Sequence, residues 1–168
     1  FIPIIKDIRS SINKFEYSNM DHEIAKLQHL KTINLKFLNY AKRSIMQGEQ
    51  ISNIVYQPEV WTKFLKHFNK RLTHSHITIL TDNELIIIKE YNNLKNSKNC
   101  SYGGVWNYIP IYNIDSVSLK DTENENTISL VIEFKDTKSI THLFSISNRS
   151  DLSVLIEDFH KFSKQYSA

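Results

Sequence analysis

The chain has 168 residues, of which 40% are hydrophobic and 23% charged, a composition typical of a folded protein rather than of a disordered one. Its formal net charge is only +3 at pH 7, so the positions of the charges matter more than their sum. A single cysteine, Cys100, excludes an intrachain disulfide and argues against a cysteine-rich zinc site. We expect one good core, or one domain with a helical extension, in a reducing compartment.

The amino terminus, Phe1-Ile-Pro-Ile-Ile5, is apolar but has neither the length nor the preceding basic region of a signal peptide. No apolar run reaches the roughly 18 residues that a membrane-spanning helix needs. Because the chain begins with Phe1, we expect it to be part of a longer protein.

Residues 1–57 are predicted to form a helical extension. Apolar residues between positions 4 and 15 recur at spacings of three and four, which predicts a first helix there. Residues 18–21 are a typical helix start, and an apolar stripe then runs over residues 24–41. Gly48 can end this second helix as a left-handed cap, so the two helices should form a hairpin. Such a stripe usually packs against its own neighbours and less often receives a partner helix.

A β domain, 58–168, is predicted to follow a polar connector at 47–59, because the period of the apolar residues changes there from 3.6 to 2. Seven strands are expected, in chain order, at about 60–68, 74–80, 84–91, 105–110, 111–119, 128–134 and 140–146. The third contains Leu85-Ile86-Ile87-Ile88, which is apolar on both faces and should be covered on both sides. The sixth alternates apolar and polar residues, the pattern of a half-buried strand.

The connections and a last helix complete this domain. Residues 67–73 are predicted to be a hairpin loop, 92–104 a long polar loop and 135–138 a turn. Asn148 can cap a final helix, whose apolar stripe consists of Leu152, Leu155, Ile156, Phe159 and Phe162. We therefore predict an α+β fold that is mainly β and ends in an amphipathic α-helix.

Seven strands followed by one capped helix resemble the pleckstrin homology superfold over about residues 60–165. Ile79-Leu80-Thr81-Asp82-Asn83 resembles the turn after the family's second strand, and residues 109–117 resemble the junction of its fourth and fifth strands. The resemblance implies a seven-stranded, partly open β-barrel capped by a C-terminal α-helix. In the family this helix plugs one end of the barrel, often with a tryptophan, and Phe159 would take that place here.

The resemblance also implies where a ligand would bind. In members that bind phosphoinositides, a lysine and a basic-x-Arg pair on the first two strands hold the phosphates. Lys66 can stand for the lysine, whereas His74-Ser75-His76 occupies the place of the pair. The family's ligand end comprises the loops between strands one and two, three and four, and six and seven. The residues expected to bind an anionic head group are Lys66, Lys70, Arg71, His74, His76, Lys95, Lys98, Lys135 and Lys138.

The two histidines, His74 and His76, allow other interpretations. Residues at i and i+2 of a strand point to one side, which could begin a metal site if His67 or His142 came near. No third ligand has a convincing spacing, so we expect no metal and no cofactor. Histidines that titrate near pH 6.5 would instead add charge to the ligand end as the pH falls.

Two functions remain open, and both are non-catalytic because the sequence has no catalytic motif. The first is recruitment of a larger eukaryotic, intracellular protein to anionic, phosphoinositide-containing membrane, which makes it cytoplasmic and peripheral to the membrane. The second is a protein-interaction module of scaffold, GTPase-regulator or chaperone type that uses the barrel and residues 1–57. Nucleic acid is disfavoured because the basic residues are not interleaved with exposed aromatic ones. The oligomeric state stays open.

Overall fold

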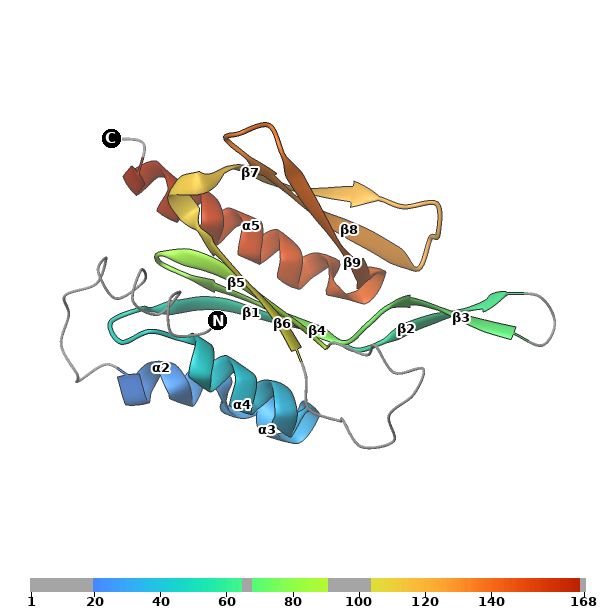
Figure 1. The fold of residues 1–168 in the computed structure, drawn as a ribbon, viewed down its shortest axis with the longest axis horizontal. Helices are drawn as coiled ribbons and strands as arrows, with labels where there is room; N and C mark the ends of the chain where they lie inside the picture. Colours follow the sequence, from blue (N-terminus) through green and yellow to red (C-terminus); the bar gives the residue numbers. More distant parts are fainter. Residues whose placement is uncertain (1–19, 65–67, 91–103, 167–168) are drawn as a thin grey trace. The chain divides into compact units, whose positions relative to one another are not determined.

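The computed structural model describes residues 20–64, 68–90 and 104–166 of the chain (Figure 1). It divides the chain into two compact units, Phe1–Ile51 and Ser52–Ala168. The predicted first helix and the loop that contains Lys95, Lys98 and Cys100 lie outside the described residues, as does Lys66. Among the described helices, none is long and apolar enough to cross a membrane.

The first unit contains α2 (Met20–Lys26), η2 (Leu27–His29), α3 (Leu30–Ile33) and α4 (Leu35–Ser44). The prediction of one continuous helix over 24–41 is wrong, because the backbone of Asn34 is extended. The Asn34 side chain accepts hydrogen bonds from the amides of Lys36 and Phe37, at 3.2 and 3.3 Å, and so caps α4. Asparagine favours such caps because its amide can bond the nearby backbone.

The turn after α4 contains the predicted left-handed glycine, Gly48, with a φ of 89°. It does not cap the helix as expected, because α4 ends at Ser44 and its C-cap residue is Ile45. The seven residues of strand β1 (Ile51–Gln57) were predicted to belong to the polar connector at 47–59. That prediction is wrong because Ile51, Val55 and Gln57 share the buried face of β1, and a buried glutamine has no apolar signature.

The second unit contains three sheets, with strand orders β1-β4-β5-β6, β2-β3 and β7-β8-β9. The pairs β2–β3, β4–β5, β5–β6, β7–β8 and β8–β9 are antiparallel. Their strands are β2 (Val60–Phe64), β3 (Phe68–Thr73), β4 (His76–Thr81), β5 (Glu84–Glu90), β6 (Gly104–Pro110), β7 (Ile114–Asp121), β8 (Thr127–Phe134) and β9 (Ser139–Ser145). The short helices η3 (Ile111–Asn113) and η4 (Ile146–Asn148) precede β7 and α5 (Arg149–Ser163), and η5 (Lys164–Tyr166) follows α5. The fold is α+β and mainly β, but its sheets are not closed into a barrel.

The connection predicted at 67–73 is the clearest error in the β region, because Phe68–Thr73 is strand β3 and pairs with β2. Asn69, Lys70 and Arg71 are polar and suggested a loop. They form a strand because the partner β2 satisfies their backbone groups, with Trp61 opposite Arg71 and Thr62 opposite Lys70. Figure 1 shows β2 and β3 as a two-stranded arm that projects beyond the larger sheets.

The core of the second unit lies between the four-stranded sheet, the three-stranded sheet and α5 (Figure 1). Its fully buried members include Leu80, Leu85, Ile87, Leu130, Phe144, Leu152, Leu155 and Phe159. Strand β5 is buried on both faces, as predicted, since Leu85, Ile86, Ile87 and Ile88 have no exposed surface. Phe159 packs in this core at 1% exposure, so the predicted apolar stripe of the last helix is confirmed.

Candidate functional site

The described basic residues that we expected to bind an anion lie in two groups. Lys70 and Arg71 are on β3, whereas Lys135 and Lys138 are in the turn between β8 and β9. Strand β9 begins directly after Lys138, and its last amide, on Ser145, donates to Gln57 Oε1 beside the arm. The seven residues of β9 span roughly 20 Å.

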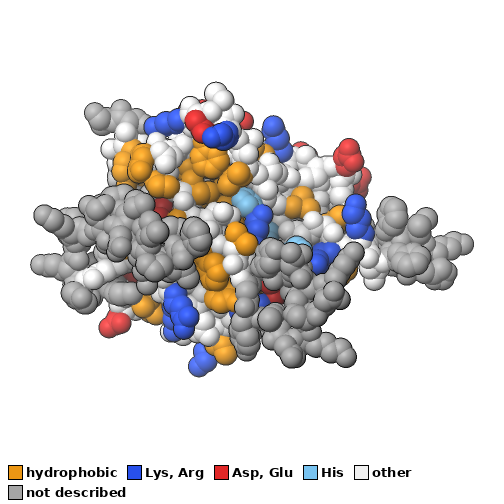
Figure 2. All heavy atoms as spheres, viewed as in Figure 1, with side chains coloured by type: hydrophobic (Ala, Val, Ile, Leu, Met, Phe, Trp, Pro, Cys, Tyr) orange, Lys and Arg blue, Asp and Glu red, His pale blue; other side chains and the backbone are white. Residues whose placement is uncertain are grey.

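The length of β9 thus separates Lys138 from the arm by roughly 20 Å. This distance exceeds the Debye length of about 8 Å at physiological salt, so the two basic groups do not act as one charged patch. Figure 2 shows the Lys and Arg side chains of the described residues scattered over the drawn face rather than gathered in one patch. A head-group pocket built jointly by the arm and the β8–β9 turn is therefore not present among the described residues.

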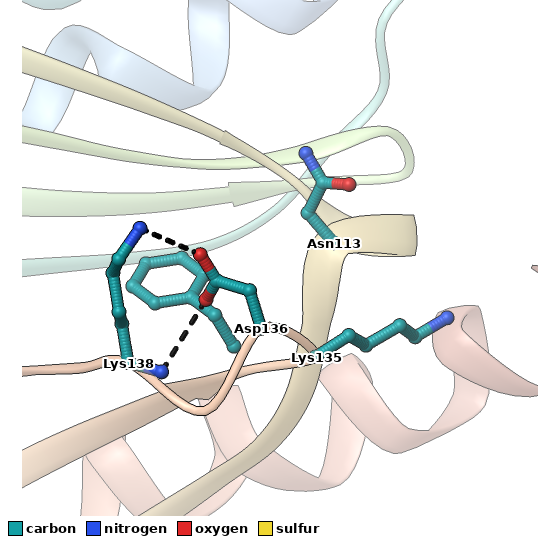
Figure 3. Close-up of a pocket in the computed structure, with 5 residues that line it drawn as sticks. Asn113, Lys135, Asp136 and Lys138 are labelled. Atoms are coloured by element: carbon teal, nitrogen blue, oxygen red, sulfur yellow. Dashed lines mark hydrogen bonds and ion pairs between the residues drawn. The ribbon is translucent and has the colours of Figure 1, made fainter.

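The β8–β9 turn borders a shallow pocket of about 400 Å³ (Figure 3). Its lining residues are Asn113, Phe134, Lys135, Asp136 and Lys138. The Lys138 ammonium lies 2.8 Å from the Asp136 carboxylate, and this hydrogen bond lowers the pKa of Asp136 and raises the pKa of Lys138. Figure 3 shows that Lys135 extends away from this pair. One of the two lysines is thus paired within the turn, which leaves little charge for an anion.

The arm carries a cluster that sequence patterns did not predict. The Trp61 side chain is 53% exposed, and the Arg71 guanidinium carbon lies 5.4 Å from the centre of its ring, within the range of a cation–π contact. Glu59 holds both residues: it accepts from Trp61 Nε1 at 3.1 Å and from Arg71 Nη1 at 2.9 Å. We call Glu59, Trp61 and Arg71 the arm cluster.

A second polar cluster lies inside the second unit, between β4 and β9. His76, Thr78 and His142 are 1%, 0% and 4% exposed, and the His76 ring packs edge-on against Phe144 with ring centres 4.6 Å apart. The rings of His76 and His142 are 6.2 Å apart. The fold thus brings His142 to His76, as the metal interpretation required, yet no three His, Cys, Asp or Glu side chains among the described residues could hold a metal.

The expected pH response of His76 is wrong, because its ring is buried. Burial lowers the pKa of His76 to about 4 and that of His142 to about 3. Both rings are therefore neutral in mildly acidic and neutral solution. His76 adds no positive charge to a ligand surface as the pH falls through that range.

Lys89 is a third member of this neighbourhood that sequence patterns did not single out. It lies directly across from His76 in the β4–β5 pair, which places their Cβ atoms roughly 5 Å apart. Its side chain is half-buried, and burial lowers the pKa of Lys89. A lysine at the end of the apolar run 85–88 was the available signal, because its stem continues the buried face of that strand.

No protein-family model matches the chain, and no curated protein is similar to it in sequence. Among solved structures, the C-terminal domain of an unknown protein from Leishmania infantum has a TM-score of 0.40 and 13% identity, over 77% of this chain and 95% of that one.

Two exchange-factor structures are also similar. The DH/PH domains of PDZ-RhoGEF, in complex with GTP-γ-S-activated RhoA, have a TM-score of 0.39 and 11% identity, over 88% of this chain and 39% of that one. The DH/PH domains of p115-RhoGEF have a TM-score of 0.39 and 13% identity, over 82% and 39%. At these TM-scores the structural likeness is weak.

Proposed function

We propose that this chain is a non-catalytic binding module whose arm, β2 and β3, contacts an acidic surface of a protein partner. The observation that carries the proposal is the arm cluster. Tryptophan and arginine are the residues that most often dominate the binding energy of protein interfaces. Here one of each is exposed or half-buried on a projecting hairpin, side by side, in a geometry fixed by Glu59.

The cluster is suited to binding because it is ordered before a partner arrives. Glu59 holds the Trp61 ring and the Arg71 guanidinium through separate carboxylate oxygens, so little side-chain entropy is lost on association. A guanidinium has five N–H donors, and only the Nη1 contact to Glu59 is formed within the described residues. The remaining donors can bind carboxylates of a partner.

The charge of the arm indicates an acidic partner. Residues 59–73 contain four Lys or Arg residues, at 63, 66, 70 and 71, and one acidic residue, Glu59. Glu59 is already bonded to Arg71, and Lys70 is exposed. Complementary charge speeds the encounter of two proteins and selects among partners.

We further infer that the fold is an open form of the pleckstrin homology superfold. The long hairpin that runs through β1 and β2 and returns through β3 and β4 supports this, together with five further strands and α5 against the core. Recruitment to anionic membrane, the other function expected from the sequence, finds less support, because the described basic residues lie in two separated groups.

The test combines partner capture with vesicle binding. The 168-residue chain is used to capture proteins from a cell extract, the captured protein is identified and purified, and its affinity is measured by calorimetry. We expect Trp61→Ala and Arg71→Glu to weaken binding about 10-fold or more each. Lys135→Glu makes the same change of charge as Arg71→Glu but in the β8–β9 turn, so it should leave the affinity unchanged and serves as the matched control.

Vesicle binding tests the alternative function, recruitment to anionic membrane. The same variants are sedimented with phosphatidylcholine vesicles, with and without a phosphoinositide, at two salt concentrations. Membrane recruitment would replace protein binding under three conditions taken together. The chain would bind vesicles only when they contain a phosphoinositide, and Arg71→Glu and Lys135→Glu would both weaken this binding. Trp61→Ala would leave the affinity for the purified protein partner unchanged.

A further inference from the structure

We propose that His76, His142 and Lys89 form a binding site for a phosphate group at one end of the core between the two larger sheets. The arm cluster plays no part in this site. Three features of the described residues support it: buried polar atoms without partners, a lysine without a counter-ion, and a matched set of donors and acceptors.

The first feature is the set of buried polar atoms that have no hydrogen-bond partner among the described residues. They include Nε2 of His76, both ring nitrogens of His142 and Oγ1 of Thr78. An unsatisfied buried polar group costs roughly as much as a lost hydrogen bond, so folded proteins contain few of them. Several such atoms on neighbouring strands need an explanation, and a bound polar ligand would supply the missing partners.

The second feature is the charge of Lys89. No hydrogen bond or ion pair joins its ammonium to the described residues, and its positive charge adds to burial in lowering the pKa of His76 and of His142. No described carboxylate compensates it. A half-buried ammonium without a counter-ion favours an anion as the occupant and repels a metal cation.

The third feature is the pattern of donors and acceptors. Nδ1 of His76 lies 2.9 Å from the carbonyl oxygen of His74, which only accepts, so Nδ1 carries the proton. Nε2 of the neutral His76 ring is therefore an acceptor. His142, when neutral, offers one donor and one acceptor, the Thr78 hydroxyl offers both, and Lys89 offers donors only.

A phosphate group fits this pattern better than other small anions. Its charged oxygens can accept from Lys89, and its P–O–H group can donate to His76 Nε2. Sulfate has no proton in neutral solution and chloride cannot donate, so neither satisfies a ring acceptor. The shared chemistry is a phosphate that retains one O–H, from a soluble compound or from a lipid head group.

The test is a titration of the 168-residue chain followed by nitrogen NMR of the histidine rings. At constant ionic strength, inorganic phosphate should shift the His76 and His142 signals with saturation, sulfate should bind more weakly, and chloride should have no effect. Lys89→Met should weaken phosphate binding about 10-fold or more, because a charge-assisted hydrogen bond is lost. Lys70→Met, on the exposed arm, should not.

Additional variants and ligands separate a loss of binding from a loss of folding and identify the source of the phosphate. Lys89→Arg retains the charge and should preserve binding if Lys89→Met impairs the fold. A soluble inositol phosphate and phosphoinositide-containing vesicles identify the source: shifts with vesicles indicate a head group, and shifts with soluble phosphates alone indicate a free ligand. Equal shifts with phosphate and chloride, or an affinity unchanged in Lys89→Met, would overturn the proposal.

Discussion

The two ends of the core in the second unit are built on the same strands but differ in chemistry. On β4, Leu80 and His76 share a face, and on β9, Phe144 and His142 do so two residues apart. Leu80 and Phe159 belong to the apolar core that α5 covers, whereas the other end contains Nε2 of His76 and both ring nitrogens of His142, which have no hydrogen-bond partner among the described residues. Apolar burial thus dominates the helix end, and polar atoms without partners among the described residues lie at the histidine end.

The difference follows from the free energies involved. Burying a large apolar side chain stabilises a fold by about 1.5–3 kcal/mol. A buried polar atom without a partner costs about 1–3 kcal/mol. Apolar burial at the helix end therefore offsets the free-energy cost of the unpartnered polar atoms at the histidine end.

The largest effect is expected at the helix end. Phe159→Ala should lower the free energy of unfolding by about 3–5 kcal/mol, because it removes a fully buried ring and leaves a cavity. Urea denaturation followed by circular dichroism measures the change. Val154→Ala on the same helix, at a side chain 48% exposed, is the control and should stay within about 0.5 kcal/mol. A similar loss in both variants would mean that α5 does not close this core.

The histidine end should make stability depend on pH. The folded pKa of His76, about 4, lies below its ordinary value of 6.5, so the unfolded chain binds more protons between these values. Stability is complete above about pH 6.5 and falls as the pH approaches 4, by about 3 kcal/mol for His76. Urea denaturation across this range, without phosphate, tests it. His76→Leu should flatten the curve, and parallel curves for both proteins would contradict the buried, neutral ring.

A satisfied buried polar group should behave differently from the histidines. Gln57 has no exposed surface, and its Oε1 accepts from the Ser145 amide at 2.6 Å and from Asn148 Nδ2 at 2.9 Å. Gln57→Leu leaves the Ser145 amide and Asn148 Nδ2 without this acceptor, so it should lower the free energy of unfolding by about 1–3 kcal/mol. Gln165→Leu, at an exposed residue, is the matched control for the free energy of unfolding. An equal, small change in both would show that the Gln57 contacts contribute nothing.

The smallest effect, and the one opposite in sign, is expected for Thr78→Val. It replaces a hydroxyl that has no partner among the described residues by a methyl group, so it should stabilise the chain by up to about 1 kcal/mol. Thr81→Val on the same strand is the control, because the Thr81 hydroxyl donates to the Glu84 carbonyl oxygen at 3.1 Å and accepts from its amide at 3.0 Å. That variant should be destabilised, and a loss in both would mean that Thr78 has a partner.

Elements with a strong local pattern were predictable. The doubly apolar β5, the alternating β8 and the stripe of α5 each follow from the period of their own residues. The errors fall where a polar residue is used structurally. Asn34 interrupts a helix, and Gln57 is buried in a strand that its sequence did not reveal.

The sequence by itself determined the mainly β, α+β class, the final helix and the basic character of residues 59–73. Tertiary structure decided that Trp61 lies beside Arg71, that Lys135 lies far from both, and that His142 meets His76. The physical reason is that periodicity reports which face a residue occupies within its own element. Which residues of distant elements meet depends on strand pairing and on how the sheets pack.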